Sequence, residues 1–268
     1  MEHSQTRLSE VVRTEQLCPD IFRLTLMAPK IAQEAQPGQF VMVQTAAGLD
    51  PLLRRPFSIH QVAAAGTVQI LFKVVGRGTQ LLSQFRQGDT LSIIGPFGKG
   101  FALPHPGEEK NICLVGGGMG IAPMLFLAKR LLRASTGGGR LLALLGARTG
   151  SEIAVLQDDF AHLGIETAIA TDDGSSGHHG LVTQLMLQAM EPGEEWQVLT
   201  CGPYPMMRGV VEICQGMQWP CQVSLETMMA CGMGACLGCA ITNPKDLSGY
   251  LHVCKDGPVF EMSEVAWR

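Results

Sequence analysis

Four cysteines near the C-terminal end of the chain have a spacing that suits metal chemistry. They are separated by four, two and fourteen residues, in the pattern C-x4-C-x2-C…C. This spacing is associated with plant-type [2Fe–2S] clusters, which four thiolates hold. We therefore predict a two-iron cluster whose ligands are Cys231, Cys236, Cys239 and Cys254.

Glycines between these cysteines support the same chemistry. Gly232, Gly234 and Gly238 allow positive φ and let backbone N–H groups approach the cluster sulfurs, whose negative charge such donors offset. A structural zinc site is the main alternative. Zinc modules usually separate paired ligands by about two to four residues, which the fourteen residues between Cys239 and Cys254 do not match. The spacing favours iron and sulfide over zinc.

Two glycine turns follow predicted strands. The first lies between the apolar stretch 112–115 and a helical pattern that begins at Pro123, where free backbone N–H groups favour a phosphate. The second ends another predicted strand, where open α/β sheets bind ligands. A tight strand-to-helix connection needs the same glycines. Each turn taken alone is therefore compatible with nucleotide binding and with a purely structural role. The residues concerned are Gly116, Gly117, Gly118 and Gly120 in the first turn, and Cys201, Gly202 and Pro203 in the second.

The elements that position these residues fall into three parts. Short alternating segments such as 40–44 and 68–75, punctuated by turns at 37–39 and 87–89, predict a small closed antiparallel barrel. Further along the chain, strands alternate with helices, which predicts a parallel sheet with covered faces. Those strands are expected over 112–115, 140–147, 166–171 and 197–201, and the helices over 123–133, 153–162, 182–190 and 206–215.

The last fifty residues are rich in Cys, Met and Gly and lack periodicity, which indicates a small module held by a cofactor. We expect a fold of class β + α/β. Its parts would be an N-terminal barrel over 1–104, a parallel α/β domain over 105–218 and a cluster module over 219–268.

Composition excludes several classes of protein. The chain has 268 residues with 46% hydrophobic and 16% charged residues, and its 32 glycines follow no Gly-X-Y period, so disorder and collagen are excluded. The net charge of −4 is spread along the chain, which disfavours nucleic-acid binding. No signal-peptide pattern opens the sequence, so we expect a cytoplasmic protein with reduced cysteines. Glycines and Pro123 interrupt the uncharged run 112–128, which argues against a membrane helix.

The order of four motifs resembles a known superfamily. Arg-Pro-x-Ser at 55–58, Gly-x-Gly-Thr at 76–79, a Gly-Gly-Gly-x-Gly-Ile-Ala-Pro loop and a Cys-Gly-Pro turn occur in that order in ferredoxin–NADP reductases. Members join an FAD-binding barrel to a nicotinamide-binding α/β domain. The segments 229–239 and 253–260 narrow the resemblance to the electron-transfer subunits of class 1B dihydroorotate dehydrogenases, the PyrK family.

The resemblance implies functional residues and partners. FAD would contact nine residues of the barrel domain, NAD would bind at the two glycine turns, and the four clustered cysteines would hold the irons. An FMN-containing catalytic subunit would oxidise dihydroorotate, and electrons would pass from FMN through [2Fe–2S] and FAD to NAD⁺ in a heterotetramer. No side chain of this chain is then required as a general acid or base. The expected FAD contacts are Arg55, Pro56, Phe57, Ser58, Leu71, Phe72, Lys73, Gly78 and Thr79.

Three other functions are alternatives to an electron-transfer subunit of dihydroorotate dehydrogenase. A flavin subunit of a hydrogenase or of a bifurcating transhydrogenase has the same architecture. A stand-alone oxygenase reductase commonly carries a full ferredoxin domain, for which fifty residues is short. A zinc-binding regulator without redox activity is the alternative outside the enzymes, and it predicts a colourless protein.

Overall fold

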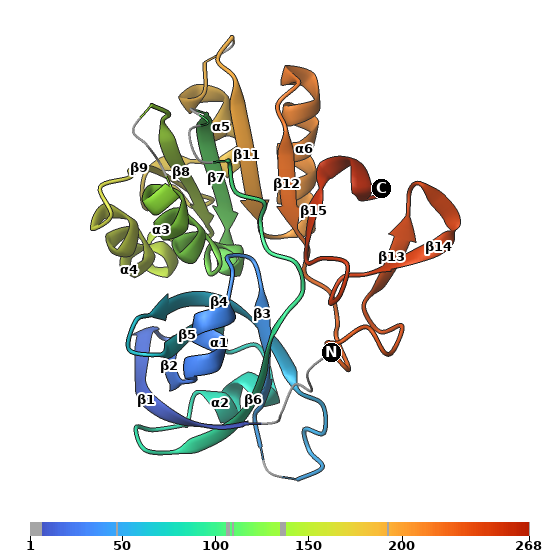
Figure 1. Ribbon diagram of the computed structural model, residues 1–268. Coiled ribbons are helices and arrows are strands. Elements are labelled where there is room, and N and C mark those ends of the chain that lie inside the picture. Colours follow the sequence, from blue (N-terminus) through green and yellow to red (C-terminus); the bar gives the residue numbers. More distant parts are fainter. Residues whose placement is uncertain are drawn as a thin grey trace.

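A computed structural model describes residues 7–46, 48–105, 108, 110–134, 138–191 and 193–267. Figure 1 shows a barrel built from the N-terminal part, a layered α/β unit beside it, and a C-terminal segment that extends from the edge of the sheet. This arrangement confirms the predicted fold class. Among the described residues, no helix is both long enough and apolar enough to cross a membrane.

The barrel is closed and entirely antiparallel, with strand order β1-β2-β5-β4-β3-β6. Alternating apolar residues such as Leu24, Val41 and Ile70 fill its interior and are fully buried. Its elements are β1 (Arg7–Cys18), β2 (Ile21–Met27), α1 (Pro29–Glu34), β3 (Phe40–Gln44), β4 (Arg55–Ala63), β5 (Thr67–Lys73), α2 (Arg77–Leu82) and β6 (Thr90–Phe97).

The second unit is a seven-stranded sheet in the order β10-β9-β8-β7-β11-β12-β15, parallel except at β15. Its central strands are apolar on both faces because helices cover both. The elements are β7 (Asn111–Gly117), η1 (Gly118–Ile121), α3 (Met124–Ala134), β8 (Leu141–Ala147), α4 (Gly150–Ala161), β9 (Glu166–Thr171), β10 (His178–His179), α5 (Val182–Ala189), β11 (Trp196–Cys201), α6 (Tyr204–Met217) and β12 (Cys221–Ser224).

The C-terminal segment leaves the sheet after β12 and returns to it. The hairpin of β13 (Ala240–Asn243) and β14 (Asp246–His252) stands apart, whereas β15 (Val259–Glu261) pairs with β12 and is followed by η2 (Met262–Glu264). The sequence did not predict β12 or β15 as members of the sheet. Both are short, and strands of three or four residues carry too little alternation to be read from a pattern.

Side chains join the barrel to the α/β unit at several points. Nδ1 of His60 on β4 lies 2.7 Å from the Ala122 carbonyl oxygen, just before α3. Arg23 on β2 forms an ion pair with Asp159 on α4. These contacts hold the two units against each other, so the cavities at their junction have fixed walls.

Candidate functional site

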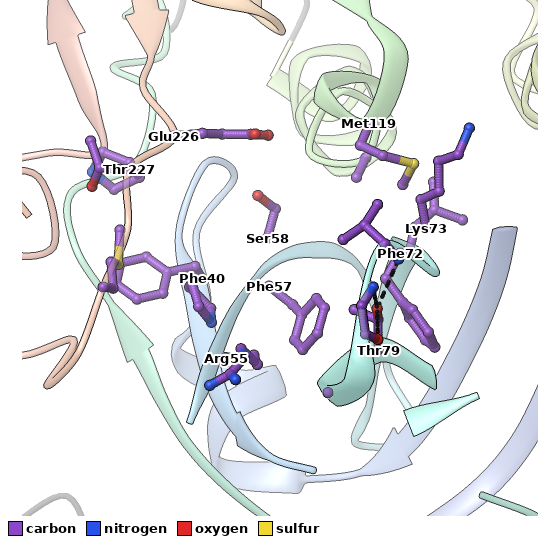
Figure 2. A pocket seen from close by; sticks show the side chains of 18 of the residues that line it. Phe40, Arg55, Phe57, Ser58, Phe72, Lys73, Thr79, Met119, Glu226 and Thr227 are labelled. Atoms are coloured by element: carbon purple, nitrogen blue, oxygen red, sulfur yellow. Dashed lines mark hydrogen bonds between the residues drawn. The ribbon is translucent and has the colours of Figure 1, made fainter. Parts of the chain in front are cut away.

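The nine residues expected to contact FAD line one cavity. It has a volume of about 500 Å³ and lies where the barrel faces the sheet (Figure 2). Strands β4 and β5 supply seven of the nine residues, Arg55 to Ser58 and Leu71 to Lys73, and α2 supplies Gly78 and Thr79. The structure thus brings together three sequence segments that are separated along the chain.

The phosphate-binding chemistry of this cavity would come from Arg55. A Cβ added to Gly78 would lie 3.2 Å from Nε of Arg55, so glycine leaves room for the guanidinium. The Thr79 hydroxyl accepts a hydrogen bond from the Val75 N–H at 2.9 Å and donates one to the Gly76 carbonyl at 2.9 Å. Thr79 therefore shapes the loop, and the planar guanidinium of Arg55 suits pyrophosphate oxygens.

Lys73 links this cavity to a second one. Its Nζ lies 2.8 Å from Oε1 of Glu152 on α4 and 3.1 Å from Oδ2 of Asp20. The hydrogen bond to Glu152 raises the pKa of Lys73 above its ordinary value. Burial would raise the pKa of Glu152, but the hydrogen bonds from Lys73 and Arg148 outweigh burial and lower it. The lysine is thus charged and fixed in position at the boundary between the two cavities.

The second cavity, of about 520 Å³, lies at the carboxyl ends of β7, β8 and β9. Gly117, Gly118 and Pro203 line it, together with Arg148 and Asp172. Ligands of open α/β sheets gather at this edge.

The remaining residues of the two turns lie outside the lining of the second cavity. Gly116, Gly120 and Cys201 are buried in the protein interior. Gly202 lines a neighbouring cavity. A Cβ on Gly120 would lie 2.3 Å from the Cys201 carbonyl oxygen, so this glycine is required by backbone packing.

The four clustered thiols lie in two pairs. The Sγ atoms of Cys239 and Cys254 are 3.2 Å apart, and the side chain of Cys236 hydrogen-bonds that of Cys231. Two irons that share four thiolates need such a pairwise arrangement. Among the described residues, no three His, Cys, Asp or Glu side chains are grouped for a single metal ion.

Backbone donors surround the sulfurs of this loop. The Gly234 N–H donates to Sγ of Cys254 at 3.1 Å, and the Gly238 N–H donates to Sγ of Cys236 at 3.4 Å. Burial raises the pKa of Cys231, but hydrogen bonds from Met233 and Cys236 outweigh it and bring that pKa to about 6. Gly234 has φ of 77°, a conformation that glycine adopts without strain. Burial and the neighbouring Cys239 thiol raise the pKa of Cys254 instead. The backbone N–H donors are therefore the feature that suits this loop to the sulfurs of an iron–sulfur cluster.

Sequence reasoning missed several residues of the first cavity. Met119 comes from η1, and Ser224, Glu226 and Thr227 come from the end of β12 and the segment after it. The position of β12 within the parallel sheet would have pointed to them, because ligands collect at the carboxyl ends of such strands.

Three known domain families match successive parts of the chain. Residues 9–101 match the oxidoreductase FAD-binding domain, and residues 114–212 match the oxidoreductase NAD-binding domain. Residues 226–266 match the iron-sulfur cluster binding domain of dihydroorotate dehydrogenase B. The fold and these domains define a flavin- and nicotinamide-linked oxidoreductase subunit that also carries an iron–sulfur domain.

Similar proteins identify the family. The chain is 39% identical over 263 residues, 97% of its length and 98% of the relative's, to the "Dihydroorotate dehydrogenase B (NAD(+)), electron transfer subunit" of Desulforamulus reducens. It is 41% identical to the protein of the same name from Geobacillus kaustophilus, covering 91% of this chain and 92% of that protein. The chain belongs to the family of dihydroorotate dehydrogenase B electron transfer subunits.

Solved structures agree with the fold. An NADH-dependent reduced ferredoxin-NADP oxidoreductase chain, studied for flavin-based electron bifurcation, superimposes with a TM-score of 0.85 at 30% identity, covering 99% of this chain and 92% of that one. A Neisseria gonorrhoeae ferredoxin NADP+ reductase covers 80% of this chain and 92% of its own at 16% identity and a TM-score of 0.67, which supports the fold alone.

Proposed function

We propose that this chain receives electrons from an FMN-containing dihydroorotate dehydrogenase catalytic subunit and delivers them to NAD⁺. The pair would form a cytoplasmic heterotetramer in pyrimidine biosynthesis. FAD, when bound, exchanges single electrons with the cluster and a hydride with the nicotinamide. This chain's own residues hold and align the three redox groups.

The main support for this function is that the cluster loop lies next to the first cavity. Met229 lines the cavity, and Cys231 follows two residues later. A Cβ on Gly232 would lie 2.6 Å from Cγ of Met42 on β3, so the cluster loop packs directly on the barrel. The cluster and the flavin would be neighbours, as electron transfer between them requires.

On the other side of the cavity, Lys73 and Met119 line both the first and the second cavity. The two cavities are therefore neighbours, and a nicotinamide in the second would lie next to a flavin in the first. The proposed FAD contacts are the nine barrel residues, and Cys231, Cys236, Cys239 and Cys254 are the proposed iron ligands. Gly117, Gly118, Pro203, Arg148 and Asp172 are the proposed lining of the NAD site.

A cysteine substitution tests the route. The purified wild-type chain should contain about one FAD and two irons. We expect Cys236→Ser to abolish orotate-linked NAD⁺ reduction in the complex with the catalytic subunit, while oxidation of NADH by a soluble dye continues. Cys18→Ser, outside the cluster loop, is the matched control and should leave both reactions intact. Loss of neither reaction in Cys236→Ser would contradict the route through the cluster.

The similarity to the bifurcating oxidoreductase chain supports one alternative function, that of a flavin and iron–sulfur subunit in a transhydrogenase complex. The catalytic partner distinguishes the two. Purified chain mixed with a dihydroorotate dehydrogenase catalytic subunit should reduce NAD⁺ when dihydroorotate is added. Activity only with reduced ferredoxin and NADP⁺ would favour the second candidate.

A further inference from the structure

A further cavity, of about 650 Å³, shares no lining residue with the two cofactor cavities. It lies where α3 faces β4 and α1 of the barrel (Figure 1), and we call it the α3 cavity. Gln61 to Ala63 of β4 and Ala32 of α1 belong to the barrel wall, and residues 126–133 of α3 supply most of the opposite wall. A ligand in this space would therefore contact both the barrel and the α/β unit.

Three basic side chains line the α3 cavity, and none of its described lining residues is acidic. Arg133 follows Lys129 by four residues and Arg130 by three, so all three bases lie on one face of α3. None of them forms an ion pair with a described residue. Like charges at this spacing destabilise a helix, and an anion between them would remove that repulsion.

Neutral groups hold two of the three bases in place. Nζ of Lys129 donates a hydrogen bond to Oε1 of Gln61. Nη2 of Arg130 donates to the Ala35 carbonyl oxygen at 3.4 Å, and the same guanidinium lies 5.6 Å from the centre of the Phe126 ring. An amide, a carbonyl and an aromatic ring orient a cation without neutralising it. The cavity therefore has fixed positive charges.

The surrounding charges do not compensate for these cations. Asp159 on α4 is the carboxylate that acts on Lys129, and it is already ion-paired with Arg23. Burial lowers the pKa of Lys129, Asp159 opposes this change, and Arg133 adds to it. A half-buried charge without an ionic partner costs free energy. A bound anion would offset that cost.

The walls indicate the chemical class of the ligand. Guanidinium groups bind phosphate oxygens through parallel hydrogen bonds, and a lysine adds a compact positive charge. Val62, Leu132 and Leu163 add apolar surface beside the bases. The volume lies within the range of about 300–1,000 Å³ that is common for small-molecule sites. Several phosphates joined to an apolar group would match both kinds of wall.

We propose that the α3 cavity binds a polyphosphate, whose phosphates contact Lys129, Arg130 and Arg133. The apolar walls favour a nucleoside triphosphate over an inorganic polyphosphate. Because the bases belong to the α/β unit and Gln61 to the barrel, the bound ligand would stabilise the two units against each other. Both cofactor cavities would stay free, since no lining residue is shared.

Calorimetric titration of the full FAD-loaded chain tests the site. NAD⁺ is kept at a saturating concentration, so that the probes do not enter the second cavity, and its own titration reports separately on the proposed function. We expect UTP and inorganic tripolyphosphate to bind, and uridine not to bind. Tighter binding of UTP than of tripolyphosphate would identify a nucleotide site, and equal binding an inorganic polyphosphate site. Binding of uridine as tight as that of UTP, or binding of neither anion, would overturn the proposal.

Substitutions of the bases locate the binding. We expect Arg130→Gln and Arg133→Gln each to weaken binding of tripolyphosphate about tenfold, because each removes a charge-assisted contact. Arg133 is exposed, so its replacement leaves the core intact. Arg86→Gln is the matched control, since the Arg86 guanidinium also donates to backbone carbonyl oxygens, those of Ser83 and Phe85, but lies outside the cavity. Wild-type affinity in either cavity variant, or an equal loss in Arg86→Gln, would overturn the proposal.

Thermal unfolding gives a second readout that is independent of activity. A ligand that binds only the folded protein raises its Tm. We expect tripolyphosphate to raise the Tm of the wild-type chain and of Arg86→Gln, and to leave that of the double variant Arg130→Gln, Arg133→Gln unchanged. An equal rise in all three proteins would place the polyphosphate elsewhere and would overturn the proposal.

Discussion

At the scale of single residues, His60 shows how a buried side chain joins the two main units. The side chain is 1% exposed, and Nδ1 donates to the Ala122 carbonyl oxygen at 2.7 Å. Nε2 has no hydrogen-bond partner among the described residues. Burial lowers the pKa of His60 from 6.5 to about 4, although the hydrogen bond to Ala122 opposes this change. The imidazole is therefore neutral in the folded protein at neutral pH.

This histidine should make folding stability depend on pH. Between pH 6.5 and 4 the unfolded chain binds the proton that the folded chain excludes, so stability falls as the pH falls through this range. The loss between pH 7 and pH 5 should be about 2 kcal/mol. Urea unfolding at the two pH values should show this loss in the wild-type protein and a smaller one in His60→Gln. His105→Gln, at an exposed position, is the control, and an equal loss in all three proteins would contradict the role of His60.

At the scale of elements, the turn from β7 through η1 to α3 carries the residues that join the two cavities. Met119 of η1 lines both cavities, and Gly117 and Gly118 line the second. The turn reaches this position because its backbone packs on the end of β11. Neither Gly120 nor Gly117 has room for a side chain, since a Cβ on Gly117 would lie 2.2 Å from Sδ of Met206.

Gly120→Ala tests this packing. The added methyl would lie 2.3 Å from the Cys201 carbonyl oxygen, so the turn has to move away from β11. We expect a loss of stability of about 1–3 kcal/mol and a higher KM for NADH in dye reduction. Gly216→Ala is the matched control, because a Cβ there meets nothing within 4 Å and lies in α6. If Gly120→Ala retained both the stability and the KM of the wild type, the packing role would be wrong.

At the scale of the whole molecule, an apolar surface surrounds the cluster loop. Met228 is 88% exposed, Leu237 66% and Met233 49%. Flexible methionine side chains suit a contact surface that adapts to a partner. The loop that would hold the cluster thus also presents apolar side chains to solvent, where a catalytic subunit could approach the irons.

A double substitution tests this surface. We expect Met228→Glu combined with Leu237→Glu to weaken association with the catalytic subunit at least about tenfold, because two charges would enter an apolar contact. The FAD and iron content of the chain should not change. Leu187→Glu, at an exposed leucine on α5, is the control. Unchanged association measured by analytical ultracentrifugation would place the contact elsewhere.

Much of this protein was predictable from local patterns. Cys231, Cys236 and Cys239 lie within nine consecutive residues, so a single loop carries all three and brings Cys231 next to Cys236. Strand β9 was predicted with the bounds that the structure has, Glu166–Thr171. Alternation and helical period are local properties, and they specify such elements before any packing takes place.

Contacts between distant segments were decided only by the tertiary structure. Cys254 meets Cys239, Lys73 meets Glu152, and Glu226 enters a cavity that is otherwise lined largely by the barrel. The tertiary structure also decided that Gly118 lines a cavity whereas Gly120, two residues later, packs against β11. The sequence by itself determined the longer strands and helices and the kinds of cofactor, but not the short strands β12 and β15. The packing of the barrel, the sheet and the returning strand β15 determined which side chains share a site, because residues far apart in the chain meet only when surfaces are buried together.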